Sequence, residues 1–288
     1  MMTIARALLP LLLLLWVIVA PLSANDDGDM MDCPALRLAD LGDELFISVR
    51  HYSAVDPDDV DILLERTRDG FVPIISESPG FVLYALTGML PDQGLAVNIF
   101  QSEEEMLAAN EKAADFVREN LASMLTVAPQ ITAGVVTVLA LPGLCADDMQ
   151  DGESMADDAG ETEDRDAMED MEPLFLSFRH YSGVDPAGVP AIAEAVAADF
   201  VQVISDSEGF RLYLNFSAAD GEVYGAINVF ASEEEMTASN ERAAEFVAEA
   251  LAELLPEAPT IIAGDTSIFH VADLEAIVAV DAEEQTEG

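Results

Sequence analysis

Residues 98–117, NIFQSEEEMLAANEKAADFV, return later in the chain as residues 228–247, NVFASEEEMTASNERAAEFV, with 14 of 20 aligned positions identical. Extended outward, the match runs from 45 to about 139 and from 174 to about 269, with one inserted residue near Gly221. The chain of 288 residues therefore contains two copies of one domain, each of roughly 95 to 100 residues.

Each copy shows the same order of predicted elements. Alternating apolar residues predict strands, an Asp-Pro pair predicts the start of one helix, and a Ser-x-x-Glu capping box predicts the start of a longer one. In the first copy these are strands at 45–49, 81–86, 96–100 and 131–139, with helix starts at Asp56-Pro57 and Ser102. In the second copy they are strands at 174–178, 210–215, 226–230 and 261–269, with helix starts at Asp185-Pro186 and Ser232.

The order βαββαβ is the ferredoxin-like pattern, in which four antiparallel strands carry both helices on one face. In the first helix, helical spacing places Val60, Leu63, Thr67, Phe71 and Ile74 on one buried stripe. The second copy has the matching stripe Val189, Ile192, Val196, Phe200 and Val203. Pro73 is expected to bend or end the first helix, because proline lacks the backbone N–H that a helix interior requires.

The segments outside the repeats differ in composition. Residues 1–24 hold one positive charge and an apolar run followed by small residues, which predicts a secretory signal peptide. An uncleaved N-terminal anchor is the alternative. Residues 25–44 form an N-terminal arm, the repeats span 45–145 and 173–270, and 271–288 form an acidic tail. Residues 146–172 contain 13 acidic residues and one Arg, which predicts a disordered acidic linker.

Charge and cysteine content restrict where the protein acts. With 11 Lys and Arg against 56 Asp and Glu, the net charge is −45, which disfavours nucleic acid or an anionic membrane surface as partner. We predict an extracytoplasmic protein, secreted or periplasmic. The two cysteines, Cys33 and Cys145, bracket the first repeat, and in an oxidising compartment they are expected to form a disulfide.

Each copy resembles an antibiotic biosynthesis monooxygenase-like domain, through its βαββαβ order, the Gly-Phe that opens the second strand and the N-[IV]-F-x-S-E-E-E-M helix start. The resemblance covers nearly all of both repeats. It implies an α+β fold in which two ferredoxin-like sheets pack through their helix-free faces, here as a pseudo-dimeric α/β barrel within one monomeric chain. Haem-degrading relatives use an Asn, a Trp and a helix-borne His. This chain departs from them, since its only Trp is Trp16 and neither long helix contains His. No cofactor is predicted.

Polar residues on the strands are the candidate ligand-binding residues. If the wholly apolar strand face covers the helices, eight polar side chains lie between the two sheets: Ser48, Arg50, Tyr84, Asn98, Ser177, Arg179, Tyr213 and Asn228. They could orient an anionic or phenolic ligand, or they could form an intersheet hydrogen-bond network with water. His51 and His180 end the first strand of each copy and are further candidates, although a histidine that is simply hydrogen-bonded at a strand end is the simpler interpretation. No metal-ligand spacing is present.

Three functions stay open at this point. The leading hypothesis is an exported protein that binds a small apolar or aromatic ligand between its sheets. A cofactor-independent oxygenase using the same cavity is the second, and a noncatalytic interaction module acting through its acidic surface is the third. No Ser-His-Asp order, phosphate loop or distinct carboxylate pair is present to indicate hydrolase or nucleotide chemistry.

Overall fold

A computed structural model describes residues 44–88, 92–141, 173–219, 221 and 223–272, all of which belong to one compact unit. The predicted signal peptide, the predicted linker, Cys33 and Cys145 lie outside these residues, as do nearly all of the predicted N-terminal arm and acidic tail.

The predicted element order is confirmed in both copies. The first copy forms β1 (Phe46–Ser53), η1 (Pro57–Asp59), α2 (Val60–Arg66), η2 (Thr67–Phe71), α3 (Val72–Ser76), β2 (Phe81–Thr87), β3 (Gln93–Phe100), α4 (Glu103–Phe116), η3 (Val117–Leu121) and β4 (Gln130–Ala140). The second forms β5 (Leu174–Ser182), η5 (Pro186–Gly188), α5 (Val189–Ala195), η6 (Val196–Phe200), α6 (Val201–Ser205), β6 (Phe210–Ala218), β7 (Val223–Phe230), α7 (Glu233–Phe246), η7 (Val247–Leu251) and β8 (Thr260–Val271). Of the short segments, η1 and η5 are 3-10 turns, and η2, η3, η6 and η7 are π-helical turns.

Local side-chain chemistry explains where the helices begin. The Ser102 hydroxyl accepts a hydrogen bond from the backbone N–H of Glu105 at 3.3 Å, and Ser232 accepts one from Glu235 at 3.2 Å. The Asp56 carboxylate accepts from the N–H of Asp58 at 3.0 Å, with Pro57 next to it in the first turn. These caps satisfy N–H groups that have no partner inside the helix.

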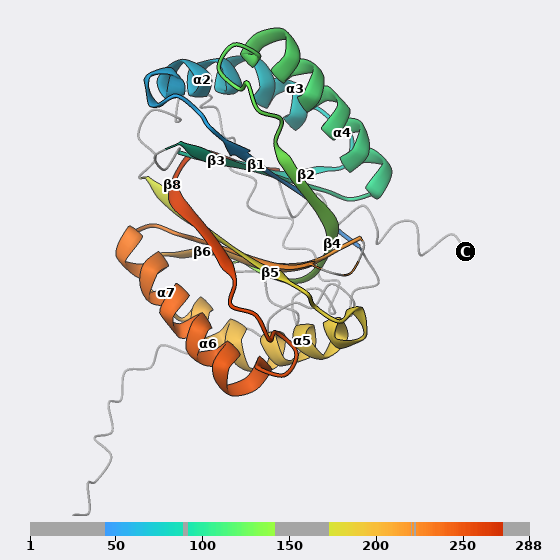
Figure 1. The fold of residues 1–288 in the computed structure, drawn as a ribbon, viewed down its shortest axis with the longest axis vertical. Helices are drawn as coiled ribbons and strands as arrows, with labels where there is room; N and C mark the ends of the chain where they lie inside the picture. The colour runs from blue at the N-terminus through green and yellow to red at the C-terminus, as the bar shows by residue number, and fades with distance from the viewer. Residues whose placement is uncertain (1–43, 89–91, 142–172, 220, 222, 273–288) are drawn as a thin grey trace, which may run out of the picture. The chain divides into compact units, whose positions relative to one another are not determined.

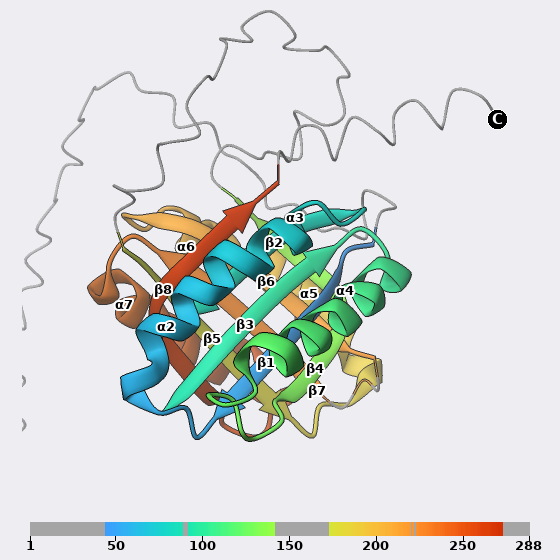
Figure 2. The ribbon, with the colours of Figure 1, turned by 90° about the horizontal axis from the view of Figure 1, so that it is seen from above.

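The eight strands close into one barrel in the order β1-β3-β2-β8-β5-β7-β6-β4. Each copy supplies four neighbouring antiparallel strands in ferredoxin-like order, with its helices on the outer face (Figures 1 and 2). The edge strands pair across the copies, β2 with β8 and β4 with β6. Gly134 permits the second of these pairings, because a Cβ at this position would collide with the Ser217 carbonyl. Closure removes the open edges that either sheet would have alone.

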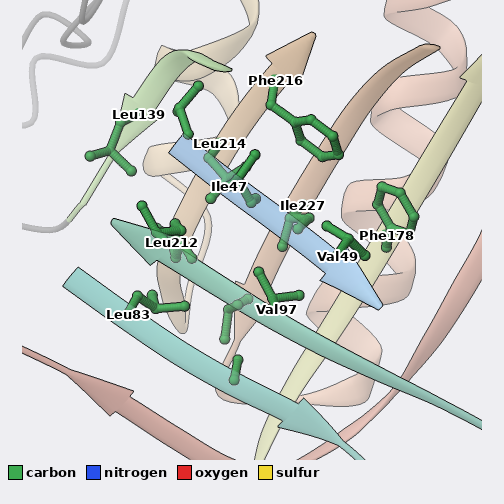
Figure 3. Close-up of a cluster of buried hydrophobic side chains, with 14 of the residues drawn as sticks. Ile47, Val49, Leu83, Val97, Leu139, Phe178, Leu212, Leu214, Phe216 and Ile227 are labelled. Carbon is green, nitrogen blue, oxygen red and sulfur yellow. The ribbon is translucent and has the colours of Figure 1, made fainter. Parts of the chain in front are cut away.

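The barrel interior is filled with apolar side chains from both copies (Figure 3). Ile47, Val49 and Val97 of the first copy face Phe178, Leu214 and Ile227 of the second in one buried cluster. The prediction that this apolar face covers the helices is therefore wrong. The interior of the barrel is covered only by the opposite sheet, whose central residues are apolar, so the more apolar faces of the two sheets meet there. The helices carry polar groups and cover the mixed faces.

The buried stripe of the first helix in each copy differs from simple helical spacing. Ile75 and Ile204 are 1% and 0% exposed, whereas the predicted Ile74 and Val203 are 45% and 50% exposed. The π-helical turns η2 and η6 each insert one extra residue per turn and so rotate the following helix by one position. Pro73 does not end the helix, and it is not the cause of the π turn, since the second copy has the same turn with Gln202.

By length and composition alone, the helical segment Pro186–Ser205 could cross a membrane. Here it packs on the sheet of the second copy through Ile192, Val196 and Phe200, as a core helix does.

Candidate functional site

The predicted polar residues lie on the helix side of each sheet. Ser48, Arg50 and Asn98 are buried there beneath α4, and Ser177, Arg179 and Asn228 occupy the equivalent places beneath α7. The expected position between the two sheets is wrong for all eight strand residues, including Tyr84 and Tyr213, which join the apolar clusters under the helices. The residues are nevertheless brought together, because β1 and β3, like β5 and β7, are paired in register.

Arg50 is the central charged group of the first copy. It is 3% exposed, and its guanidinium donates to the Asn110 side-chain oxygen on α4. Oriented to suit its neighbours, the Asn98 amide accepts from Arg50 Nη1 at 3.3 Å and donates to the Ser48 carbonyl at 3.2 Å. The ion pairs among the described residues involve Arg118 and Arg242 and do not include Arg50 or Arg179. Burial lowers the pKa of Arg50, with Tyr52 and Tyr84 acting in the opposite direction.

Arg179 has a similar setting in the second copy. It is 2% exposed, and its Nη1 donates to the Asn240 side-chain oxygen on α7 at 2.8 Å. The Ser177 hydroxyl donates to the same oxygen at 3.0 Å. Within the described part of the chain, Arg179 Nε has no hydrogen-bond partner. Both copies thus hold a buried cation whose hydrogen bonds go to neutral groups.

A cavity lies between the helices and the sheet of the first copy. The space that the centres of water molecules can occupy inside it is about 30 Å³, which is enough for about two waters. The lining is polar at Arg50, Tyr52, Tyr84 and Thr67 and apolar elsewhere. The apolar lining residues are Leu63, Phe71, Leu86, Ala96, Ala113, Phe116, Val117, Leu121 and Leu125. Both π-helical turns of this copy, η2 and η3, contribute lining residues, and such turns are frequent at functional sites.

The second copy has a smaller cavity in the same place, with a volume of about 20 Å³ on the same measure. Arg179, Tyr181 and Tyr213 line it as their counterparts line the first. Two additional polar residues, Asn215 and Tyr224, also line it.

All five tyrosines of the chain line these two cavities. Burial raises the pKa of Tyr84 well above its usual value, with Tyr52 acting in the same direction and Arg50 opposing. Burial raises the pKa of Tyr213 to about 12, against the opposing effect of Arg179. Burial also raises the pKa of Tyr52, Tyr181 and Tyr224. At neutral pH these hydroxyls are protonated and can donate hydrogen bonds into the cavities.

The two candidate histidines are not part of either cavity. His51 Nε2 lies 3.0 Å from Gln93 Oε1, and the His180 ring packs edge-on against Phe178 at 6.0 Å. Neither is among the lining residues of the two helix-sheet cavities. Across the described residues, no three His, Cys, Asp or Glu side chains are grouped so as to hold a metal ion.

Several site residues escaped the sequence-based list. Tyr52 and Tyr181 lie two residues beyond Arg50 and Arg179 on the same strand face, so strand periodicity could have identified them. Asn110 and Asn240 had a signal too, since both interrupt helices of good helix formers; the structure shows that they bind the arginines. The apolar lining from η2 and η3 had no signal, because π turns are not visible in residue spacing.

No protein-family model matches this sequence, and no curated protein does. Solved structures do match. A proposed monooxygenase from Fusobacterium nucleatum subsp. nucleatum superposes with a TM-score of 0.54 at 12% identity, covering 79% of this chain and 94% of that one. A proposed monooxygenase from Lactobacillus acidophilus gives 0.50 at 10% identity, covering 80% and 96%. An anthrone oxidase-like protein gives 0.50 at 13% identity, covering 83% and 97%.

These similarities concern the fold. The chain has the α/β barrel of antibiotic biosynthesis monooxygenase-like proteins, built here from two repeats of one polypeptide. The expected fold class is confirmed. Identities of 10 to 13% do not transfer an activity, because one fold hosts many functions.

Proposed function

We propose that the protein binds a small, mostly apolar molecule carrying one anionic oxygen, in a cavity between helices and sheet. The observation that carries this proposal is the buried guanidinium of Arg50, which lines the larger cavity and bonds only to neutral amides among the described residues. A buried cation without a counterion costs several kcal/mol. An anionic oxygen placed beside Arg50 offsets part of that cost.

The shape of the cavity indicates how such a molecule fits. The space for about two waters beside Arg50 suits an anionic head group, and the Tyr52 and Tyr84 hydroxyls, held neutral by burial, are donors to it. The walls that surround this head group are apolar. Phe116, Val117 and Leu125 are only partly buried, so a larger apolar body enters where these side chains meet the surface.

Binding between the two sheets, the position expected from sequence, has no support. The interior of the barrel is occupied by packed side chains such as Val49, Phe178 and Phe216, which are 1%, 3% and 0% exposed. The proposed site therefore moves to the opposite face of the sheet, under the helices of the first copy.

A cofactor-independent oxygenase is the second candidate function. Three solved proteins with this fold are described as monooxygenases or as anthrone oxidase-like. A buried cation favours the phenolate or enolate form of a substrate, the form that is richest in electrons. The lining of the first cavity contains no carboxylate or imidazole to act as a base, so the site is suited to hold an anion that has already formed.

The test uses the full chain and p-nitrophenolate as probe, with nitrobenzene as the uncharged analogue. We expect the anion to bind and nitrobenzene to bind far more weakly. Arg50→Met should weaken the binding of p-nitrophenolate by about 10- to 100-fold, since hydrogen bonds to charged groups contribute about 1.5–3 kcal/mol. Arg211→Met is the matched control, because Arg211 is exposed and, among the described residues, bonds only to the carbonyl of Phe210.

Stability separates a binding site from a structural network. Replacing an unpaired buried cation by an apolar side chain of similar size is often neutral for stability. If Arg50→Met lost several kcal/mol of unfolding free energy while the affinity for p-nitrophenolate stayed unchanged, Arg50 would be a structural residue and the proposal would fail. Mass spectrometry of small molecules extracted from the native protein would identify the natural ligand.

We further propose that the barrel acts outside the cytoplasm. The apolar run in residues 1–24 and the net charge of −45 support export of a protein with an acidic surface. N-terminal sequencing of the exported protein tests this, and a start near Asn25 is the expected result.

A further inference from the structure

The two copies differ at the wall of their cavities. In the first copy Tyr52 pairs across the strands with Gly94, and in the second Tyr181 pairs at the same register with Tyr224. At this position, on the strand face that lines the cavity, the first copy has no side chain (Gly94) and the second copy has a large one (Tyr224). A second exchange lies nearby, where Leu86 of the first lining is replaced by Asn215.

Tyr224 fills space in the second copy. Its side chain is 1% exposed and lines the second cavity, and its hydroxyl lies 3.4 Å from Thr137 Oγ1 on β4 of the first copy. Leu255, which closes the same cavity, is 5% exposed, whereas its counterpart Leu125 is only partly buried. The second cavity is the smaller of the two, at about 20 Å³ against about 30 Å³.

The helices over the two cavities differ in their arginines. The helices over the first cavity carry Arg66, Arg68 and Arg118, all exposed, and Arg66 Nη1 donates to the Asn120 carbonyl at 2.6 Å, linking α2 to η3 beside the lining. The equivalent residues over the second cavity are Ala195, Ala197 and Ala248. These arginines stand beside acidic residues that the second copy lacks, such as Asp58, Asp59 and Asp61, so the helices over the two cavities carry the same net charge and the cavity wall is what distinguishes the copies.

We propose that each chain holds one ligand site, in the first copy, and that Tyr224 closes the second copy, which acts as the structural half of the barrel. This inference rests on the proposed binding of an anionic ligand at a buried arginine. It assigns Gly94 and Tyr224 as the positions that decide which copy accepts a ligand.

The experiment measures the stoichiometry and affinity of p-nitrophenolate on the full chain by titration calorimetry. We expect one equivalent per chain. Arg50→Met should weaken this binding, while Arg179→Met should leave both the stoichiometry and the affinity unchanged. Gly94→Tyr should abolish binding at concentrations that saturate the parent protein, and circular dichroism with thermal unfolding verifies that this variant is folded.

The reciprocal change opens the second copy. Tyr224→Gly should raise the stoichiometry to two, and Tyr224→Phe, which keeps the ring, should leave it at one. Two equivalents on the parent protein, one lost with each arginine, would overturn the inference while leaving the proposed function intact. Absence of binding to the parent protein would overturn the proposed function and this inference with it.

Discussion

The tyrosines make alkaline stability the most direct test of the two buried sites. All five have a pKa raised by burial in the folded chain, whereas each titrates near pH 10 when unfolded. Below pH 10 both states keep the phenolic protons, so the tyrosines have no effect on stability. Above pH 10 the unfolded state loses protons that the folded state retains, and stability falls as pH rises.

The magnitude follows from this difference. A tyrosine that stays neutral when folded and has a pKa near 10 when unfolded costs about 1.4 kcal/mol of stability at pH 11. Five such residues give a loss of about 7 kcal/mol as an upper bound, which is comparable with the entire stability of a typical domain, about 5–15 kcal/mol. Few other groups change charge in this range, since Lys112 is the only lysine of the chain.

The assay is urea unfolding followed by far-ultraviolet circular dichroism at pH 8, 10 and 11, together with tyrosinate absorbance on the folded protein. We expect little tyrosinate before unfolding, then all five tyrosines ionising together. Tyr224→Phe is the control and should reduce the loss at pH 11 by about 1.4 kcal/mol. If tyrosinate formed near pH 10 with circular dichroism unchanged, the tyrosines would not be buried and the helix-sheet cavities as described would be wrong.

Three further predictions concern the barrel and the segments around it. Phe216→Ala should cost about 3–5 kcal/mol of unfolding free energy in urea denaturation, because Phe216 is 0% exposed in the barrel interior; a loss below 1 kcal/mol would contradict a packed interior. Residues 173–272 expressed alone should dimerise or aggregate, since their apolar sheet face and edge strands lose their cover, and a monodisperse monomer in small-angle scattering would contradict this. Cys33 and Cys145 should form a disulfide that closes a loop of roughly 110 residues and stabilises the protein by about 4–5 kcal/mol. Thiol titration of the denatured, unreduced exported protein should then find no free thiols, and two free thiols per chain would contradict the prediction.

Much of the fold was readable from the sequence because it depends on local chemistry. The capping residues Ser102 and Ser232, the Asp-Pro helix starts and the period-two strands act within a few residues of chain, and the structure confirms each. Duplication then implied two ferredoxin-like halves, and the resemblance to monooxygenase-like domains implied their union in one barrel. The candidate residues Arg50, Tyr84 and Asn98 were also identifiable, since polar side chains on otherwise apolar strands stand out.

Which face of each sheet those residues occupy was decided only by tertiary structure. Both faces of β1 and β5 are buried, so period-two alternation separates the faces but does not say which one meets the helices. That choice depends on partners far along the chain: the opposite sheet offers mainly apolar side chains, whereas α4 and α7 offer Asn110 and Asn240 to the arginines. The π-helical turn in the first helix buries Ile75 instead of Ile74, and this shift also depends on tertiary packing. The sequence by itself determined the elements and the polar residues, and the long-range packing of helices on sheets decided where a ligand could reach them.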